Sequence, residues 1–296
     1  MPAVTVLIPA HNAAATLAQT LDSLVAQTYR DFDVLIINDA SADNTAELAL
    51  GYRQQLAIEV VTLTENAGVA GALNHGLALI ESPYIARLDA DDMAFPQRLE
   101  RQMAFLEANR DIAVCSSAMQ MFFDDGKATE VLTKPQHDAT IKTALLQYSA
   151  LSHTASTFRK SFFDDVGVFD TRVDFAEDYD LWTRGALLGK RYTNLPDVLT
   201  HYRRHANSVS VQKMQLQYER DLIIKRKYIT ALLDGDAPDN LAEFFSLMTS
   251  FTSQEVAITV VEQSLPLLLK LGRRVPDPAL FAEIVSKCIG RHLRNK

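Results

Sequence analysis

Residues 4–12 read Val4-Thr-Val-Leu-Ile-Pro-Ala-His-Asn12, a run of β-branched and aliphatic residues that gives way to a polar turn. Such a short apolar run, closed by proline, predicts a buried β-strand over residues 4–8. Leu17, Leu21 and Leu24 then recur at helical spacing. The chain therefore begins as a strand, a polar turn and a helix.

The same unit recurs three times in the first 110 residues. Runs at 33–37, 58–63 and 84–88 have the composition of strands, and a polar segment and a helical pattern follow each of them. Repeated strand–helix units predict an α/β fold with a mostly parallel sheet and helices on both of its faces.

The later part of the chain has a different pattern. Shorter strands are expected at 114–122, 156–158 and 192–195, between short helices. Beyond residue 210 the pattern is helical only, so we expect an all-helical C-terminal region over 213–296. Its helices are expected at 213–233, 241–249, 254–271 and 278–293.

Composition excludes several classes of protein. The 296 residues include 29 Lys and Arg against 37 Asp and Glu, a net charge of −8, and 48% are hydrophobic. That is too apolar for a disordered chain and too acidic for a general nucleic-acid binder. Cys115 and Cys288 lack the spacing of a zinc site, and we expect them to be buried in a reducing compartment. No signal-peptide core or membrane-length apolar run occurs, so the expected location is the cytoplasm.

Polar side chains cluster after the four strands of the first half. They are His11 and Asn12 after the first strand, Asp39 after the second, Asn66 after the third, and Asp89 and Asp91 after the fourth. Because ligands of parallel sheets bind outside the carboxyl ends of the strands, these loops predict one site. The turn after the first strand has no glycine-rich or lysine loop, which argues against a dinucleotide or P-loop site.

Asp89 and Asp91 stand two residues apart at a strand end, where both carboxylates can reach one hard divalent cation, Mn²⁺ or Mg²⁺, and its waters. Such a cation would supply positive charge for a phosphate ligand. The alternative is that these carboxylates are solvated or cap the helix that follows.

Asp39 ends a buried strand and has two readings. A carboxylate only accepts hydrogen bonds, so it suits the imide N–H of uracil or thymine. The alternative is a helix cap, together with Ser41.

Glu177, Asp178 and Asp180 place three carboxylates within four residues at a predicted helix start. Crowding of this kind can raise a carboxyl pKa and provide a general base, although Asp178 would also serve as an N-cap. Trp182 is either part of the helix core or a platform for a sugar ring.

At this point the chain resembles the inverting glycosyltransferases of family 2, which have the GT-A fold, over residues 1–212. The resemblance implies a Rossmann-like α/β domain with a nucleotide-binding half over 1–110 and an acceptor-binding half over 111–212. The matching motifs are Val6-Leu-Ile-Pro-Ala-His-Asn12, Ile37-Asn-Asp-Ala-Ser-Ala-Asp43, Glu65-Asn-Ala-Gly68, Arg87-Leu-Asp-Ala-Asp-Asp92, Ala176-Glu-Asp-Tyr-Asp-Leu-Trp182 and Tyr202-Arg-Arg-His-Ala-Asn-Ser-Val-Ser210.

The resemblance also implies roles. Asp91 is the expected metal ligand, Asp178 the catalytic base and Glu177 its neighbour on the acceptor side. His205 is expected to touch phosphate or metal, and His153 and Trp182 to line the acceptor site. The residues expected to hold the nucleotide are Pro9, Ala10, His11, Asn12, Asp39, Asn66, Gly68, Arg87 and Asp89.

The implied reaction is metal-dependent inverting transfer of a sugar from a UDP- or dTDP-sugar to a hydroxyl acceptor, in cell-surface polysaccharide or glycolipid synthesis. The alternatives are a sugar-1-phosphate nucleotidyltransferase, which shares the sheet, and a scaffold that binds nucleotide sugars without catalysis. Two positions depart from the family pattern: Asn38 stands where aspartate is common, and Ala40 where glycine is usual.

The C-terminal end is basic. From Lys270 onward seven Lys and Arg face two acidic residues, a net charge of +5, and Leu265 and Leu267–Leu269 lie nearby. This combination predicts peripheral contact with an anionic membrane, where lipid-linked saccharide acceptors reside. The alternatives are a solvated helical face and a dimer contact.

Overall fold

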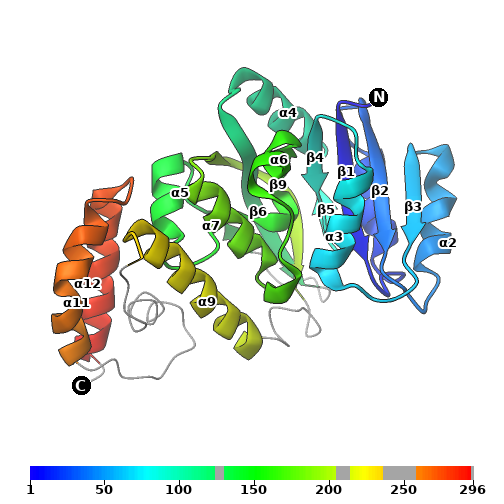
Figure 1. The fold of residues 1–296 in the computed structure, drawn as a ribbon. Coiled ribbons are helices and arrows are strands. Elements are labelled where there is room, and N and C mark those ends of the chain that lie inside the picture. Colours follow the sequence, from blue (N-terminus) through cyan, green and yellow to red (C-terminus); the bar gives the residue numbers. More distant parts are fainter. Residues whose placement is uncertain (124–129, 205–213, 236–257, 295–296) are drawn as a thin grey trace.

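The computed structural model describes residues 1–123, 130–204, 214–235 and 258–294. Within them one mixed sheet of nine strands has the order β3-β2-β1-β4-β8-β6-β9-β5, and β7 pairs with β6. Figure 1 shows the helices packed around this sheet. The predicted α/β architecture is confirmed.

The first half of the sheet is parallel. Strands β3, β2, β1 and β4 lie side by side, so their carboxyl ends meet at one edge. The strands are β1 (Val4–Ala10), β2 (Phe32–Asn38), β3 (Ile58–Thr62) and β4 (Tyr84–Arg87), and the helices between them are α1 (Leu17–Val25), α2 (Thr45–Leu50) with the 3-10 turn Gly51–Gln54, and α3 (Gly68–Leu79).

β1 continues two residues past the predicted end at residue 8. Proline is rare inside a sheet because it donates no ladder hydrogen bond. Here β4 pairs with β1 only from Val4 to Leu7, so at Pro9 the strand is paired on its β2 side alone. The proline therefore ends the pairing with β4 without ending the strand.

Alternate residues of the central strands enter two cores on opposite faces of the sheet. Val6 and Ile8 pack with the leucines of α1, whereas Leu7 and Ile37 pack with α3 and the later helices. Both faces are therefore buried, which explains the continuous apolar runs in the sequence.

In the second half, β8 joins β4 to β6 by antiparallel pairing, and β9 runs parallel to β6. β9 is much longer than the predicted 192–195, because register shifts opposite Ser117 and Ala118 carry the pairing past Pro196. The strands are β5 (Met93–Ala94), β6 (Ile112–Phe123), β7 (Val131–Leu132), β8 (Thr157–Arg159) and β9 (Arg191–Arg204). The helices are α4 (Arg98–Ala108), α5 (Asp138–Ala144), α6 (Ser161–Val166) and α7 (Glu177–Leu187), with 3-10 turns η2 (His153–Ala155) and η3 (Thr171–Val173).

The described residues after β9 form helices joined or followed by turns. α9 (Met214–Leu232) packs on α7, and α11 (Ile258–Gly272) and α12 (Pro278–Arg294) lie side by side at the end of the molecule away from β3. The helix expected at 241–249 and the domain boundary near 212 lie outside the described residues. Cys115 and Cys288 are buried free thiols, as expected. None of the described helices has the length and apolar character needed to cross a bilayer.

Candidate active site

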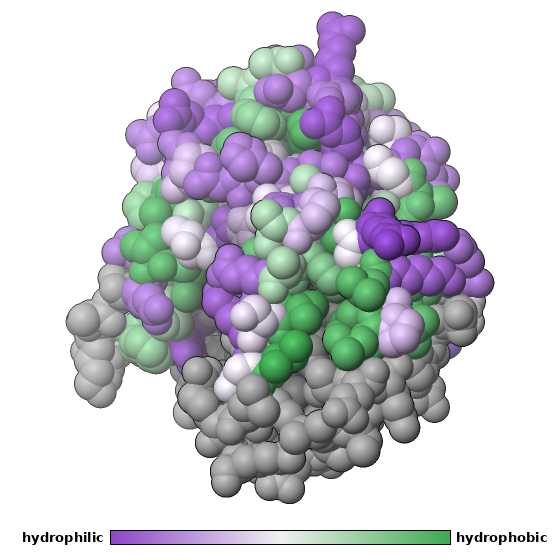
Figure 2. Space-filling model, turned by 90° about the vertical axis from the view of Figure 1, so that its left-hand side faces the viewer, coloured by the Kyte–Doolittle hydropathy of each residue, from purple (hydrophilic) through white to green (hydrophobic). Residues whose placement is uncertain are grey.

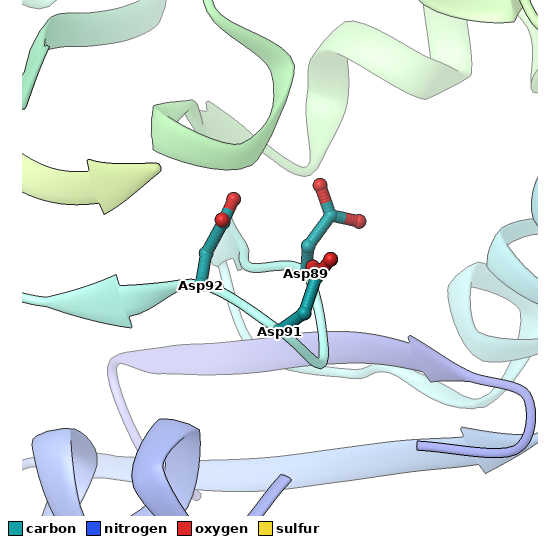
Figure 3. Close-up of side chains that lie close together, drawn as sticks. All are labelled: Asp89, Asp91 and Asp92. Atoms are coloured by element: carbon teal, nitrogen blue, oxygen red, sulfur yellow. The ribbon is translucent and has the colours of Figure 1, made fainter. Parts of the chain in front are cut away.

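A cluster of carboxylates follows β4. Asp89, Asp91 and Asp92 each place one oxygen within 4.8 Å of the others, and Figure 3 shows all three side chains on the same side of the turn. Asp89 and Asp91 are half-buried and Asp92 is buried. Burial first, and the neighbouring charges of Asp89 and Asp91, raise the pKa of Asp92 well above its usual range. Three hard oxygen donors with crowded negative charge fit a Mg²⁺ or Mn²⁺ ion.

This turn is fixed from two sides. Thr16, just before α1, and Thr20, within it, both donate their hydroxyls to the carbonyl of Ala90 at 3.0 Å. At the end of β9, the main-chain N–H of Arg203 donates to Asp92 Oδ1 at 2.8 Å and its Nε to the Asp91 carbonyl at 2.9 Å. The positions of the carboxylates are therefore set by α1 and β9.

Arg87 lies between this cluster and the acidic start of α7. It is 5% exposed and forms an ion pair with Asp89. Burial opposes its charge, but neighbouring carboxylates, Asp89 first and Glu177 among them, outweigh burial and raise its pKa. Through this ion pair Arg87 braces the turn that carries Asp89.

Asp39 lies at the end of β2 and is 3% exposed. Its Oδ1 accepts a hydrogen bond from the N–H of Ala67 at 2.6 Å, and its own N–H donates to the carbonyl of Ala10 at 2.8 Å. This carboxylate therefore joins the ends of β1 and β2 to the start of α3. The capping alternative is not what the structure shows, because the residue before α2 is Asn44.

His11, Asn12 and Asn66 surround Asp39. His11 Nδ1 lies 2.6 Å from the Asp39 carbonyl, and Asn66 Nδ2 donates to the same carbonyl at 3.4 Å. Asn12 Nδ2 lies 2.9 Å from His11 Nε2. These three side chains are exposed, so the structure brings the expected nucleotide residues together on one accessible rim.

Pro9 and Ala10, also expected to hold the nucleotide, differ from these exposed side chains. Both are buried within β1, so they offer the site backbone atoms and no side-chain surface. Gly68, at φ +73°, starts α3, and a Cβ at this position would lie 3.5 Å from the carboxylate of Asp174. Glycine therefore suits this position, because L side chains rarely adopt that conformation.

The two departures from the family pattern are both visible. Ala40 adopts φ +52°, a left-handed conformation in which glycine is free of strain. Asn38 is buried, donates to Thr62 Oγ1 at 3.2 Å and accepts from the N–H of Ser41 at 3.3 Å. Asparagine can do both because its amide carries a donor and an acceptor, whereas an ionised aspartate only accepts.

Glu177 is the first residue of α7 and is 7% exposed. Its Oε1 lies 3.8 Å from Nδ1 of His153. Burial, followed by the charge of Asp178, raises the pKa of Glu177 to about 8. Burial, with Arg87 and Lys134 nearby, lowers the pKa of His153 well below its usual range. At neutral pH the pair is therefore a neutral imidazole beside a carboxyl group that retains its proton.

Asp178 is half-buried and held from two sides. Ser149 Oγ donates to its Oδ2 at 2.9 Å, and the N–H of Tyr179 to its Oδ1 at 2.7 Å. Lys134 Nζ donates to the carbonyls of Ser149 and Leu151, at 2.7 and 2.6 Å. Burial lowers the pKa of Lys134 to about 8, although the charge of Asp178 favours the ammonium form. The N-cap of α7 is Ala176, so the alternative in which Asp178 serves as the N-cap is wrong.

The turn η2 links the two carboxylate groups. Thr154 Oγ1 accepts the N–H of Asp89 at 3.1 Å, and the preceding residue, His153, faces Glu177. Residues at the end of β4 and at the start of α7 therefore meet across η2 and Arg87.

One expected residue does not join this site, and another lies outside the described residues. Trp182 is fully buried and stacks on Phe158 with ring centroids 5.5 Å apart, so the prediction of an exposed sugar platform is wrong and the core alternative holds. Trp182 comes four residues after Asp178 on α7, and its indole packs into the core against Phe158. His205 lies outside the described residues.

Sequence reasoning missed several residues of the site. For Asp92, the only sign of a role in the sequence is that it directly follows Asp91, the expected metal ligand. Lys134, Ser149 and Thr154 lie in loops of irregular spacing, where no periodicity marks a role. Asp174 was missed although it approaches Gly68 and lies near enough to Asp39 for that charge, after burial, to raise its pKa.

Comparison with models of protein families identifies the family of this chain. A family model described as glycosyl transferase family 2 matches residues 5–167, more than half of the chain. The fold and site thus define a glycosyltransferase of the GT-A type. The chain belongs to glycosyl transferase family 2, whose members are inverting enzymes.

Individual relatives agree. The chain is 31% identical over 225 residues to the putative glycosyltransferase EpsE of Bacillus subtilis, covering 74% of this chain and 79% of EpsE. It is 28% identical over 247 residues to an uncharacterized glycosyltransferase of Haemophilus influenzae, covering 79% and 75%. The amylovoran biosynthesis glycosyltransferase AmsE of Erwinia amylovora is 28% identical over 198 residues, covering 67% and 74%.

Solved structures share the fold at lower identity. S. aureus TarS residues 1–349, in complex with UDP, has a TM-score of 0.63 at 18% identity and covers 99% of this chain and 89% of that one. The mannosyltransferase PcManGT of Pyrobaculum calidifontis, in complex with GDP-Man and Mn²⁺, has a TM-score of 0.61 at 20% identity, covering 100% and 88%. The expected GT-A fold is confirmed. Family membership also decides against the nucleotidyltransferase and scaffold alternatives.

Proposed function

We propose that this glycosyltransferase moves a sugar from a UDP- or dTDP-sugar to a hydroxyl group of a saccharide or lipid-linked saccharide, in the synthesis of a cell-surface polysaccharide or glycolipid. The carrying observation is that the Asp89–Asp92 carboxylates and the Glu177–Asp178 pair meet across Arg87 and η2. A donor and an acceptor need two such neighbouring groups. The name of AmsE and the UDP in the TarS complex support the substrate classes.

Asp39 is the group proposed to read the base. It lies buried at the end of β2, and its Oδ1 accepts one N–H from Ala67. A carboxylate has further acceptor capacity, which suits the imide N–H of uracil or thymine. The exposed His11 and Asn66 lie beside it and would contact the nucleotide.

Asp91 and Asp89, with Asp92 behind them, are the residues proposed to hold Mn²⁺ or Mg²⁺. When bound there, the cation supplies positive charge that offsets the negative charge of the leaving diphosphate. Arg87 holds Asp89 in place, and the Arg203 N–H holds Asp92. These contacts keep the carboxylates converged before the donor arrives.

Asp178 is the proposed base. Its carboxylate takes the proton of the acceptor hydroxyl as that oxygen bonds to the anomeric carbon, while the bond to the nucleoside diphosphate breaks and the diphosphate leaves with the electron pair. Attack from the opposite face inverts the anomeric centre, so no protein nucleophile is needed. Ser149 and the Tyr179 N–H orient the carboxylate, and Glu177 and His153 form the neighbouring uncharged wall.

The donor is tested by a thermal-shift screen of UDP-, dTDP- and GDP-sugars, with and without Mn²⁺. We expect UDP- or dTDP-sugars to raise Tm, and the rise to be larger with Mn²⁺. A rise with GDP-sugars alone would contradict the role given to Asp39.

Two variants separate binding from chemistry. Asp178→Asn should lose at least 10³-fold in release of nucleoside diphosphate during transfer while keeping the donor-induced rise in Tm. Asp91→Asn should lose the Mn²⁺-dependent part of that rise. Asp31→Asn, at the exposed amino end of β2, is the control and should match the wild type. Full turnover by Asp178→Asn would contradict the role of Asp178 as the base. An unchanged Mn²⁺ effect in Asp91→Asn would contradict the role of Asp91 as a metal ligand.

A further inference from the structure

An apolar groove runs between α11 and α12. Its volume is about 570 Å³, and its lining comes almost wholly from aliphatic and aromatic side chains of the two helices. Leu265 and Leu269, one turn apart on α11, are 48% and 67% exposed. Figure 2 shows this face, with hydrophobic residues gathered along it and strongly hydrophilic residues beside them. Exposed leucines on one helix face are a feature of surfaces that contact another phase or partner.

A basic pocket adjoins the groove. Lys142 of α5, with Arg273 and Arg274 just after α11, lines a second cavity of about 550 Å³. Arg273 lines both cavities and is exposed. Leu265, Leu269 and Arg273 follow one another at intervals of four residues, so the apolar face leads directly to the cations.

One cation of the pocket is only weakly engaged. Arg274 pairs with Asp234 at the surface, where the side chains are 41% and 61% exposed, whereas Lys142 is held more firmly by Asp138 at 2.8 Å. An exposed ion pair contributes little, so an external anion can replace Asp234 at Arg274. The chain from Lys270 onward has a net charge of +5, in a protein whose net charge is −8. This end is therefore the part suited to an anionic surface.

We propose that the α11–α12 groove and its basic pocket dock on an anionic phospholipid bilayer. Leu265 and Leu269 enter the acyl boundary, and Arg273 with its neighbours meets the phosphate headgroups. Charge complementarity selects this occupant, because an anionic bilayer offers an apolar interior to the leucines and a layer of phosphate headgroups to the cations beside them. An interfacial helix pair needs both parts, because apolar insertion and basic attraction each bind weakly alone.

The test uses the full chain and sedimentation with two kinds of vesicle: phosphatidylcholine alone, and phosphatidylcholine with 30% phosphatidylglycerol. We expect binding to the anionic vesicles only, and weaker binding in 0.5 M NaCl. Leu269→Gln should reduce the partition coefficient about tenfold and Arg273→Gln about fivefold. The matched controls are Leu188→Gln, at 58% exposure beside α7, and Arg53→Gln, at an exposed position before β3; neither should change binding.

Three results would overturn the proposal. One is equal binding to both vesicles or to neither. Another is an equal fall in the partition coefficient for anionic vesicles in Leu269→Gln and in Leu188→Gln. The third is a dimer in sedimentation velocity that Leu269→Gln dissociates without any vesicle binding, which would assign the groove to a second copy. All four substitutions replace exposed side chains, and unchanged thermal unfolding confirms that the fold is retained.

Discussion

Ala40 carries backbone strain next to the residue proposed to read the base. Its φ of +52° lies in the left-handed region, which costs an L-residue about 1 kcal/mol or more. It follows Asp39 directly, and its N–H lies 3.0 Å from the carbonyl of Asn38. Asn12, on the facing turn, has φ +50°, which asparagine tolerates better than alanine.

Ala40→Gly should therefore stabilise the protein. Relief of the strained φ outweighs the added freedom of the unfolded chain, and we expect a gain of about 0.5–1 kcal/mol in the free energy of unfolding. Urea unfolding measures it. The control is Ala46→Gly inside α2, which should lose about 1 kcal/mol. A loss in both variants would show that Ala40 is not strained.

Glu177 is the second residue whose environment opposes its ordinary state. Its pKa of about 8 lies above the ordinary value of 4.5, because burial and the Asp178 charge disfavour the carboxylate. The folded protein therefore holds a proton that the unfolded chain releases. The stability due to this proton is fully present below pH 4.5 and is lost as the pH rises through about 8.

Glu177→Gln should remove this part of the pH dependence. We expect the fall in Tm between pH 5 and pH 8, measured in EDTA, to be smaller in the variant by several degrees. Other buried groups contribute equally to both proteins and cancel in the difference. Glu65→Gln, at an exposed position, is the control. Equal falls in Tm for the wild type and Glu177→Gln would contradict the raised pKa.

At the scale of elements, the acidic start of α7 depends on two loops that are distant in sequence. Lys134, just after β7, holds the carbonyls of Ser149 and Leu151, and Ser149 in turn holds Asp178. A hydrogen bond to a charged group contributes about 1.5–3 kcal/mol. The orientation of the proposed base is thus set by the turn that follows α5.

Ser149→Ala should lower turnover about tenfold with little change in donor KM, because it frees one oxygen of the base and leaves the donor site untouched. Ser149→Thr keeps the hydroxyl and should restore most of the rate. Steady-state kinetics with the donor found by the thermal-shift screen measure both. An unchanged kcat in Ser149→Ala, or a change in KM alone, would contradict this role.

The elements were predictable to different degrees. β1, β2 and β4 could be predicted because both of their faces are buried, which leaves continuous apolar runs, and the half-exposed edge strand β3 was marked by its β-branched residues. β9 was predicted only over 192–195, since Pro196 and Asp197 read as a strand end and the register shifts that absorb them depend on pairing with β6. Trp182 was assigned a possible surface role because composition cannot show which face of α7 meets Phe158.

For the whole molecule, topology explains why much of the site could be predicted. Asp39, Asn66, Asp89 and Asp91 follow parallel strands, so the sheet alone brings them to one edge. Asp178 was predicted from a motif. Its position near that edge of the sheet depends on η2, whose contacts the sequence does not reveal. Lys134 could not be predicted, because its importance comes from two carbonyl groups that only the folded chain places beside it.

The far end of β9 has one more consequence. Arg203 is at once a rung of the sheet, opposite Phe122, and a support for the turn that carries Asp91 and Asp92. A chain shortened to end at Arg204 would keep that support, whereas one ending at Leu199 would lose it together with the pairing of β5. The turn that carries the proposed metal ligands therefore depends on the last residues of a strand that follows it by more than a hundred positions in the sequence.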